Sequence, residues 1–70
     1  MENKEIYYNA LIENNGRINE IDLGETIGLD EKETREIIVR LLSEYKIEYA
    51  VNRACNYSII AKSKRRNNSR

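Results

Sequence analysis

Apolar residues recur every three or four positions between residues 30 and 45, which is the repeat of an amphipathic helix. Asp30 can cap the first turn of this helix, and Glu33 completes a reciprocal capping box with it. The opposite side of the helix is charged, so the pattern predicts one face in a core and one face in solvent. The stripe predicted to be buried consists of Thr34, Ile37, Ile38, Leu41, Leu42 and Tyr45.

A shorter apolar segment comes directly before this helix. Leu23 and Ile27 are four residues apart and therefore share one face of a helix of about two turns. Asp22 can cap that helix, with Glu25 as its partner in a second capping box. The sequence thus predicts two consecutive helices with a tight connection.

Two glycines are placed in a way that suits a closely packed pair of helices. Gly24 lies within the shorter segment, where the missing side chain lets another helix approach closely. Gly28 follows that segment and can adopt the positive φ that the turn requires. Together the two glycines predict a helix-turn-helix.

The first helix is expected over residues 3–14, with Asn3 as its cap and Asn15-Gly16 as its left-handed stop. Its apolar residues are Ile6, Tyr7, Tyr8, Ala10, Leu11 and Ile12. They cover roughly 240° of the circumference, which is wider than one core contact requires. Either the helix has a second face for a copy of the chain or another protein, or its tyrosines lie half-exposed with their hydroxyls in water. The partner-binding residues predicted on the first interpretation are Ile6, Tyr7 and Ala10.

Residues 47–59 alternate between apolar and polar side chains, which is the pattern of a β-hairpin. The alternating apolar residues are Ile47, Tyr49, Val51, Cys55, Tyr57 and Ile59. Residues 52–54 separate the two runs and predict the hairpin tip. Cys55 is expected to be a small buried apolar residue. Residues 17–21 are expected to add a brief strand before the second helix.

The last nine residues differ from the rest of the chain. Residues 62–70 hold five basic residues and no apolar residue. With no apolar side chain to bury, this segment is predicted to be a disordered basic tail. One domain is therefore expected over residues 1–61. Its predicted core consists of Tyr8, Leu11, Ile18, Leu23, Ile27, Leu29, Ile37, Ile38, Leu41, Leu42, Ile47, Tyr49 and Ile59.

The order of these elements resembles the winged helix-turn-helix superfamily over about residues 5–60. The residues that carry the resemblance are Leu23, Gly24, Ile27, Gly28, Leu29, Thr34, Ile37 and Leu41. The resemblance implies an α+β fold with three helices and a small antiparallel sheet that has one wing. It also implies that the helix over residues 30–45 lies in the major groove of DNA while the wing contacts the backbone.

Composition argues against several classes of function. The chain has no histidine and one cysteine, so a disulfide framework, a zinc site and His-based catalysis lack their residues. No nucleophile stands at a recognisable spacing from a base, and no glycine-rich phosphate loop is present, so we expect no enzyme, cofactor or metal. No apolar stretch is long enough for a signal sequence or membrane span, so a cytoplasmic protein is expected. The abundance of Asn, Ile, Lys and Glu is typical of an AT-rich bacterial or mobile-element source.

The two ends of the chain carry opposite net charges, although the formal net charge of the whole chain is zero. Residues 1–50 carry six basic and all twelve acidic residues, a net charge of −6, whereas residues 51–70 carry six basic residues and no acid, a net charge of +6. The basic end is expected to attract phosphate. Asp30, Glu31 and Glu33 either oppose phosphate binding or only stabilise the positive end of their helix. The residues predicted to bind DNA are Lys32, Arg35, Val39, Arg40, Arg53, Lys62, Lys64, Arg65 and Arg66.

Two functions fit these observations. The first is a small DNA-binding transcriptional regulator, expected to be a homodimer, with the helix in the major groove and the wing and tail on the backbone of double-stranded DNA. The second is a protein-interaction module, such as an accessory subunit of a replication or mobile-element complex, which the acidic first fifty residues favour. A variant of the second adds binding of single-stranded DNA through Tyr49, Tyr57 and the tail, since aromatic stacking beside basic residues suits unpaired bases.

Overall fold

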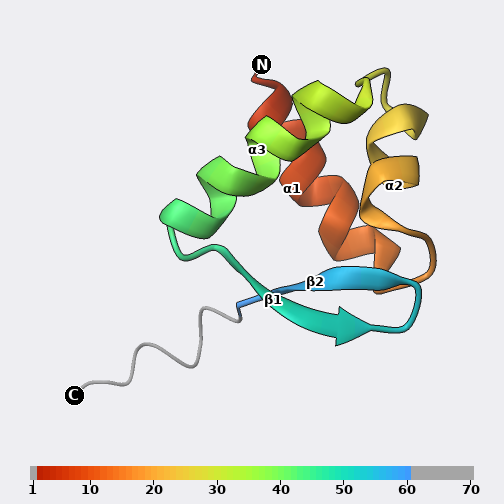
Figure 1. The fold of residues 1–70 in the computed structure, drawn as a ribbon, viewed down its shortest axis with the longest axis vertical. Helices are drawn as coiled ribbons and strands as arrows, with labels where there is room; N and C mark the ends of the chain where they lie inside the picture. The colour runs from red at the N-terminus through yellow and green to blue at the C-terminus, as the bar shows by residue number, and fades with distance from the viewer. Residues whose placement is uncertain (1, 61–70) are drawn as a thin grey trace.

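Three helices followed by a two-stranded antiparallel sheet make up the computed structural model, which describes residues 2–60 (Figure 1). The elements are α1 (Asn3–Asn14), α2 (Glu20–Thr26), α3 (Glu31–Ser43), β1 (Ile47–Asn52) and β2 (Cys55–Ile59). The helices pack against one another, and the hairpin lies below them in the view of Figure 1. The predicted α+β class is confirmed, and the arrangement is compatible with a winged helix.

The start of α3 follows the predicted capping box. The Glu33 amide donates to Asp30 Oδ1 at 2.7 Å, and the Asp30 amide donates to Glu33 Oε1 at 3.0 Å. Because these two donors are satisfied by side chains, the helix begins where the sequence indicates. The residues of the predicted stripe that are buried are Thr34, Ile37, Ile38 and Leu41.

The end of α3 comes earlier than predicted. The Lys46 amide donates to the Leu41 carbonyl at 3.0 Å and the Tyr45 amide donates to the Leu42 carbonyl at 3.1 Å, which are the two bonds of a Schellman motif. Tyr45 occupies the left-handed position of this motif, with a φ of 60°. The prediction that Tyr45 continues the buried stripe is wrong, because the helix has already ended and the residue is 77% exposed.

The start of α2 also differs from the prediction, and the strand expected over residues 17–21 does not form. Asn19 caps α2, and its side chain accepts a hydrogen bond from an amide of the first turn at 2.7 Å. Before it, Asn14 Nδ2 donates to the Ile18 carbonyl at 2.9 Å, and Asn14 Oδ1 accepts from the Ile18 amide at 3.0 Å. The predicted cap at Asp22 is wrong, because Asn19 caps the helix three residues earlier. The predicted strand is wrong, because the Asn14 side chain forms hydrogen bonds with backbone groups that a strand would pair.

Helices α2 and α3 approach each other at a glycine. A Cβ atom placed on Gly24 would lie 2.0 Å from Thr34 Oγ1, and Thr34 is fully buried. The Thr34 hydroxyl donates to the Asp30 carbonyl at 2.8 Å, which holds it in this position. Gly28 has a φ of 90° after the end of α2. The roles predicted for both glycines are confirmed.

Tyr7 connects α1 to α2. Its side chain is fully buried, and its hydroxyl donates to the Glu20 carbonyl at 2.8 Å. Burial raises the pKa of this hydroxyl, and the neighbouring Cys55 and Glu20 raise it further. The prediction that Tyr7 binds a partner is wrong, because the core and this hydrogen bond occupy it. Of the other two residues of that group, Ile6 is partly buried and Ala10 packs against the core.

The hairpin contains an irregularity that explains why its alternation fails. The strand partners are Ile47 and Ile59, Glu48 and Ser58, Tyr49 and Tyr57, and Asn52 and Cys55. The register therefore shifts between Tyr49 and Asn52, where β1 has one residue more than β2. Such a bulge moves the following side chains to the other face of the sheet. Val51 was predicted to lie on the same face of the strand as the buried Ile47. It is 72% exposed because of this bulge.

The core collects buried residues from all five elements and one connection. It consists of Tyr7, Leu11, Leu23, Leu29, Ile37, Ile38, Leu41, Ile47 and Cys55. Four other predicted core residues are partly buried against it, namely Tyr8, Ile27, Leu42 and Ile59. The prediction is confirmed for the burial of Cys55 and is wrong for Ile18 and Tyr49, which are 37% and 68% exposed. Ile18 lies in the connection held by Asn14, and Tyr49 lies on the outer strand at the bulge.

One carboxylate attaches the hairpin to the helices. Glu20, the first residue of α2, accepts a hydrogen bond from the Asn56 amide on Oε1 at 3.1 Å and one from Asn56 Nδ2 on Oε2 at 3.3 Å. Burial of Glu20 acts to raise the pKa of its carboxyl, but hydrogen bonds from Asn56, from its own amide and from Cys55 outweigh burial and lower the pKa below its usual value. A side chain thus gives β2 the partner that the expected strand would have provided.

We expect Gly24→Ala to lower the free energy of unfolding by about 3 kcal/mol, because the new methyl group has no space beside Thr34. Urea unfolding followed by circular dichroism measures this change. The double variant Gly24→Ala, Thr34→Ala removes the colliding hydroxyl and should be more stable than the sum of the two single changes predicts. A single variant as stable as the parent would contradict the packing described for α2 and α3.

The stability of the fold should depend on the ionisation of Glu20. Because the pKa of Glu20 is lower in the folded than in the unfolded chain, its charge stabilises the fold above the usual carboxyl pKa of about 4.3. This contribution is lost as the pH falls through the lowered folded pKa. We expect Glu20→Gln to unfold more easily than the parent at neutral pH, by about 1–2 kcal/mol. The difference should shrink on acidification to about pH 3.

The exposed Glu13 of α1 provides the matched control for this pH series. Glu13→Gln removes the same charge from the surface without touching the hairpin, so its stability should follow that of the parent. A Glu20→Gln variant whose deficit is equally large at neutral and acidic pH would rule out the proposed role of the charge.

Candidate nucleic-acid interface

The outward face of α3 carries both signs of charge. Lys32, Arg35 and Glu36 are exposed, and Val39, one turn further along the helix, is 62% exposed. A ligand can therefore reach this face. Arg35 Nη2 lies 2.7 Å from Glu31 Oε2, one helical turn earlier on α3. Such a surface pair adds little stability. It does place a carboxylate beside one of the cations that the sequence assigns to DNA.

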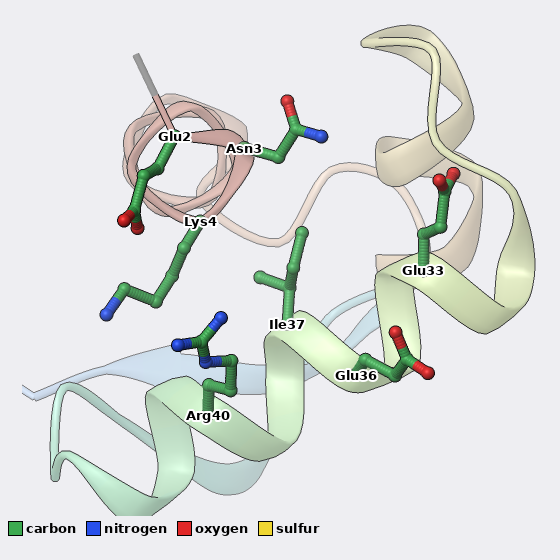
Figure 2. A pocket seen from close by; sticks show the side chains of 7 residues that line it. All are labelled: Glu2, Asn3, Lys4, Glu33, Glu36, Ile37 and Arg40. Carbon is green, nitrogen blue, oxygen red and sulfur yellow. The ribbon is translucent and has the colours of Figure 1, made fainter.

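A groove separates the start of α1 from α3, and Figure 2 shows the side chains around it. The residues that line it are Glu2, Asn3, Lys4, Glu33, Glu36, Ile37 and Arg40. Arg40 extends from α3 toward α1 in this view. Because five helical positions correspond to a rotation of roughly 140°, Arg40 lies on a different side of α3 from Arg35. The residues of α3 that were predicted to bind DNA are therefore divided between the outward face and this groove.

An ion pair joins α1 to the end of α3 beside the groove. Lys4 Nζ lies 2.6 Å from Glu44 Oε2. The hydrogen bond from Lys4 lowers the pKa of the Glu44 carboxyl. Within residues 2–60, Arg40 forms no ion pair, although Glu36 precedes it by one helical turn. Lys4 and Glu44 therefore connect α1 to the end of α3, and Arg40 lines the groove beside them.

The hairpin tip is bound to the helical part of the molecule. The Ala54 amide donates to the Gly16 carbonyl at 2.9 Å, and Arg53 Nη1 donates to the Asn15 carbonyl at 3.4 Å. In Figure 1 the tip lies beside the connection between α1 and α2, away from α3. The structure thus does not bring Arg53 together with Lys32 and Arg35, although all three are exposed.

The remaining predicted DNA-binding residues, Lys62, Lys64, Arg65 and Arg66, lie outside the described residues, as does the predicted tail. Residues 2–60 carry seven basic and twelve acidic residues, a net charge of −5, whereas residues 61–70 carry five basic residues and no acid. The excess of positive charge in the sequence therefore lies outside the described residues.

The base of the hairpin, which we define as Tyr45, Lys46, Tyr49 and Ile60, contains one residue, Tyr49, that the sequence already links to single-stranded DNA. The Ile60 amide donates to the Lys46 carbonyl at 3.0 Å, so the chain leaves the sheet beside the end of α3. Tyr45 and Tyr49 are among the most exposed large apolar side chains of the described residues. The sequence predicts Tyr45 in the buried stripe of the helix and Tyr49 in the core.

The tyrosine ring pair on the hairpin supports Tyr49 from one side. The ring centroids of Tyr49 and Tyr57 are 5.7 Å apart and the ring planes meet at 81°, an edge-to-face contact. Tyr57 is partly buried against the core, whereas Tyr49 is exposed. Lys46 Nζ lies 5.6 Å from the centroid of the Tyr8 ring, so its charge is directed toward α1.

The chain matches no family model, and no curated protein or solved structure matches it either. Within residues 2–60, no group of three or more His, Cys, Asp or Glu side chains is arranged to hold a metal ion. No helix in the same range is long and apolar enough to cross a membrane. The interface must therefore be judged from its own geometry and charge.

We expect Tyr45→Gly to raise the free energy of unfolding by about 1 kcal/mol. Glycine adopts the positive φ of this position without the steric cost that a side chain carries. Because Tyr45 is largely exposed, its replacement removes little packing. Thermal unfolding of Tyr45→Gly beside Tyr45→Ala tests this, since alanine keeps the steric cost and should give no gain. A Tyr45→Gly protein less stable than the parent would show that the ring contributes packing.

Proposed function

We propose that this protein is a small DNA-binding protein of the winged helix type, with a regulatory role in transcription. The outward face of α3 enters the major groove, and the basic C-terminal segment holds the phosphate backbone. The observation that carries the proposal is the open face of α3, where Val39 is 62% exposed one helical turn after the exposed Arg35. A helix with such a face fits the major groove, which is wide enough to admit an α-helix.

The folded domain and residues 62–70 differ in charge and therefore contribute to DNA binding in different ways. The described domain is acidic overall, so it does not provide the attraction that dominates affinity for DNA. Five basic residues in residues 62–70 can neutralise several phosphates without a folded scaffold. Lys32 and Arg35 then position the helix, and the acidic residues around them limit how tightly it binds.

A second candidate is a protein-interaction module that binds through α1. Ile12 is 49% exposed on this helix, and Ile6 is only partly buried. Exposed apolar residues of this kind suit a homodimer or another protein. Sedimentation of the parent and of Ile12→Asp separates the candidates, because a dimer formed through α1 should dissociate in the variant while duplex binding by a monomer should persist.

Duplex affinity measured over a series of salt concentrations tests the DNA proposal. We expect the double variant Lys32→Ala, Arg35→Ala to bind roughly tenfold more weakly and to reduce the slope of log affinity against log salt by about 2. Glu31→Gln should bind a few-fold more tightly, because it removes a negative charge and releases Arg35 from its ion pair. Removal of residues 62–70 should reduce the slope by several more units.

The matched control is Arg17→Ala, which removes an exposed cation in the connection between α1 and α2. Its duplex affinity should equal that of the parent. If neither the α3 variants nor the removal of residues 62–70 changes binding, the proposed DNA interface is incorrect.

A further inference from the structure

We propose that two side chains on the outward face of α3 read bases in the major groove, with Glu36 selecting a cytosine and Val39 selecting a thymine next to it. This inference rests on the proposed DNA-binding function and adds the sequence preference of the same face. Contacts with phosphate position a protein on DNA, whereas contacts with base edges carry the specificity. Lys32 and Arg35 serve the first purpose, so the second is left to their neighbours.

The Glu36 carboxylate differs from the other carboxylates along α3 because it has no partner. The carboxylates that cap the helix or form ion pairs are Asp30, Glu31, Glu33 and Glu44. Within residues 2–60, Glu36 is in no side-chain hydrogen bond and no ion pair, although Lys32 lies one turn before it and Arg40 one turn after it. In Figure 2 the Glu36 side chain points away from α1, and the residue is exposed, so its oxygens are open to a ligand.

A carboxylate in this position suits cytosine. An ionised carboxylate only accepts hydrogen bonds, and cytosine presents its N4 amino group as a donor in the major groove. Guanine and thymine present the oxygens O6 and O4 there, which repel a carboxylate, and adenine places the acceptor N7 beside its amino group. Because a carboxylate near phosphates otherwise weakens binding, Glu36 supports binding only where it faces a cytosine.

Val39 is the apolar residue of this face. It is 62% exposed, so packing does not account for a valine here. Valine is also a poorer helix former than alanine or leucine, because its branched side chain loses rotamer freedom in a helix. The C5 methyl group of thymine is the apolar group that projects into the major groove. The two methyl groups of Val39 can make the apolar contact that such a group accepts.

The spacing of the two residues matches the spacing of the bases. Residues three apart share one face of a helix, and Glu36 and Val39 are therefore about 4.5 Å apart along its axis. Successive bases of a DNA strand rise by about 3.4 Å. A helix lying along the groove thus brings the two side chains to neighbouring base pairs. The expected site contains a cytosine and a thymine at consecutive positions of the duplex.

Selection from a pool of duplexes with a randomised segment of about 12 base pairs, slightly more than one helical turn, gives the site preferred by the full-length parent. We expect a cytosine next to a thymine in this site. Replacing the C·G pair by T·A should weaken binding by the parent roughly tenfold. Replacing the thymine by uracil, which lacks only the methyl group, should weaken it roughly three- to fourfold.

Each variant should remove one preference and keep the other. Glu36→Gln should lose the preference for cytosine and favour adenine, because the amide of glutamine both donates and accepts and fits N6 and N7 of adenine. Val39→Ser removes both methyl groups and should bind the thymine and uracil duplexes equally. Because Glu36→Gln also removes a negative charge, the quantity compared is the ratio of affinities for two duplexes, in which a general gain cancels.

Glu13→Gln and Val51→Ser are the matched controls, since they make similar changes at exposed positions of α1 and β1. Both should keep the affinity ratios of the parent. Duplex binding by the parent without base preference, or with preferences that survive Glu36→Gln and Val39→Ser, would overturn this inference and leave the proposed function standing. Failure of the parent to bind any duplex at low salt would overturn both.

Discussion

The attachment of the Glu20 carboxylate to the backbone of β2 is the interaction on which the arrangement of the hairpin depends. Glu20 lies at the start of α2, its carboxylate binds Asn56, and its carbonyl receives the Tyr7 hydroxyl from α1. One residue therefore connects two helices and the sheet. Because the carboxylate is buried, its hydrogen bonds must offset the cost of removing a charge from water. The hairpin is consequently positioned by a polar contact as much as by the apolar core.

Some features that depend on neighbouring residues could be predicted from the sequence, whereas features that depend on distant residues could not. The cap at Asp30 and the turn at Gly28 each depend on a few consecutive residues, and both are present. The bond between Glu20 and Asn56 joins residues 36 positions apart, and no local pattern indicates it. The same holds for the bulge in β1, which exposes Val51 against the alternation of the strand.

The candidate site was predictable in composition and not in geometry. Lys32, Arg35 and Arg40 are all on α3, as the helical pattern indicates, but a rotation of roughly 140° separates the last two. Helical spacing alone did not reveal that α1 forms a groove beside Arg40. The spacing of Tyr45 places it in the buried stripe, and only the early end of α3 exposes it. The position of a helix terminus thus decides whether a residue is structural or available for binding.

The bulge in β1 also bears on the solubility of the protein. An open strand edge invites extended segments of other chains to add to it, and a two-stranded sheet has little else to cover its sides. Because the register shifts after Tyr49, a strand added from another chain could form regular hydrogen bonds with β1 over only a few residues. A small protein with an exposed ring on its outer strand can in this way remain dispersed at high concentration instead of growing into fibrous assemblies.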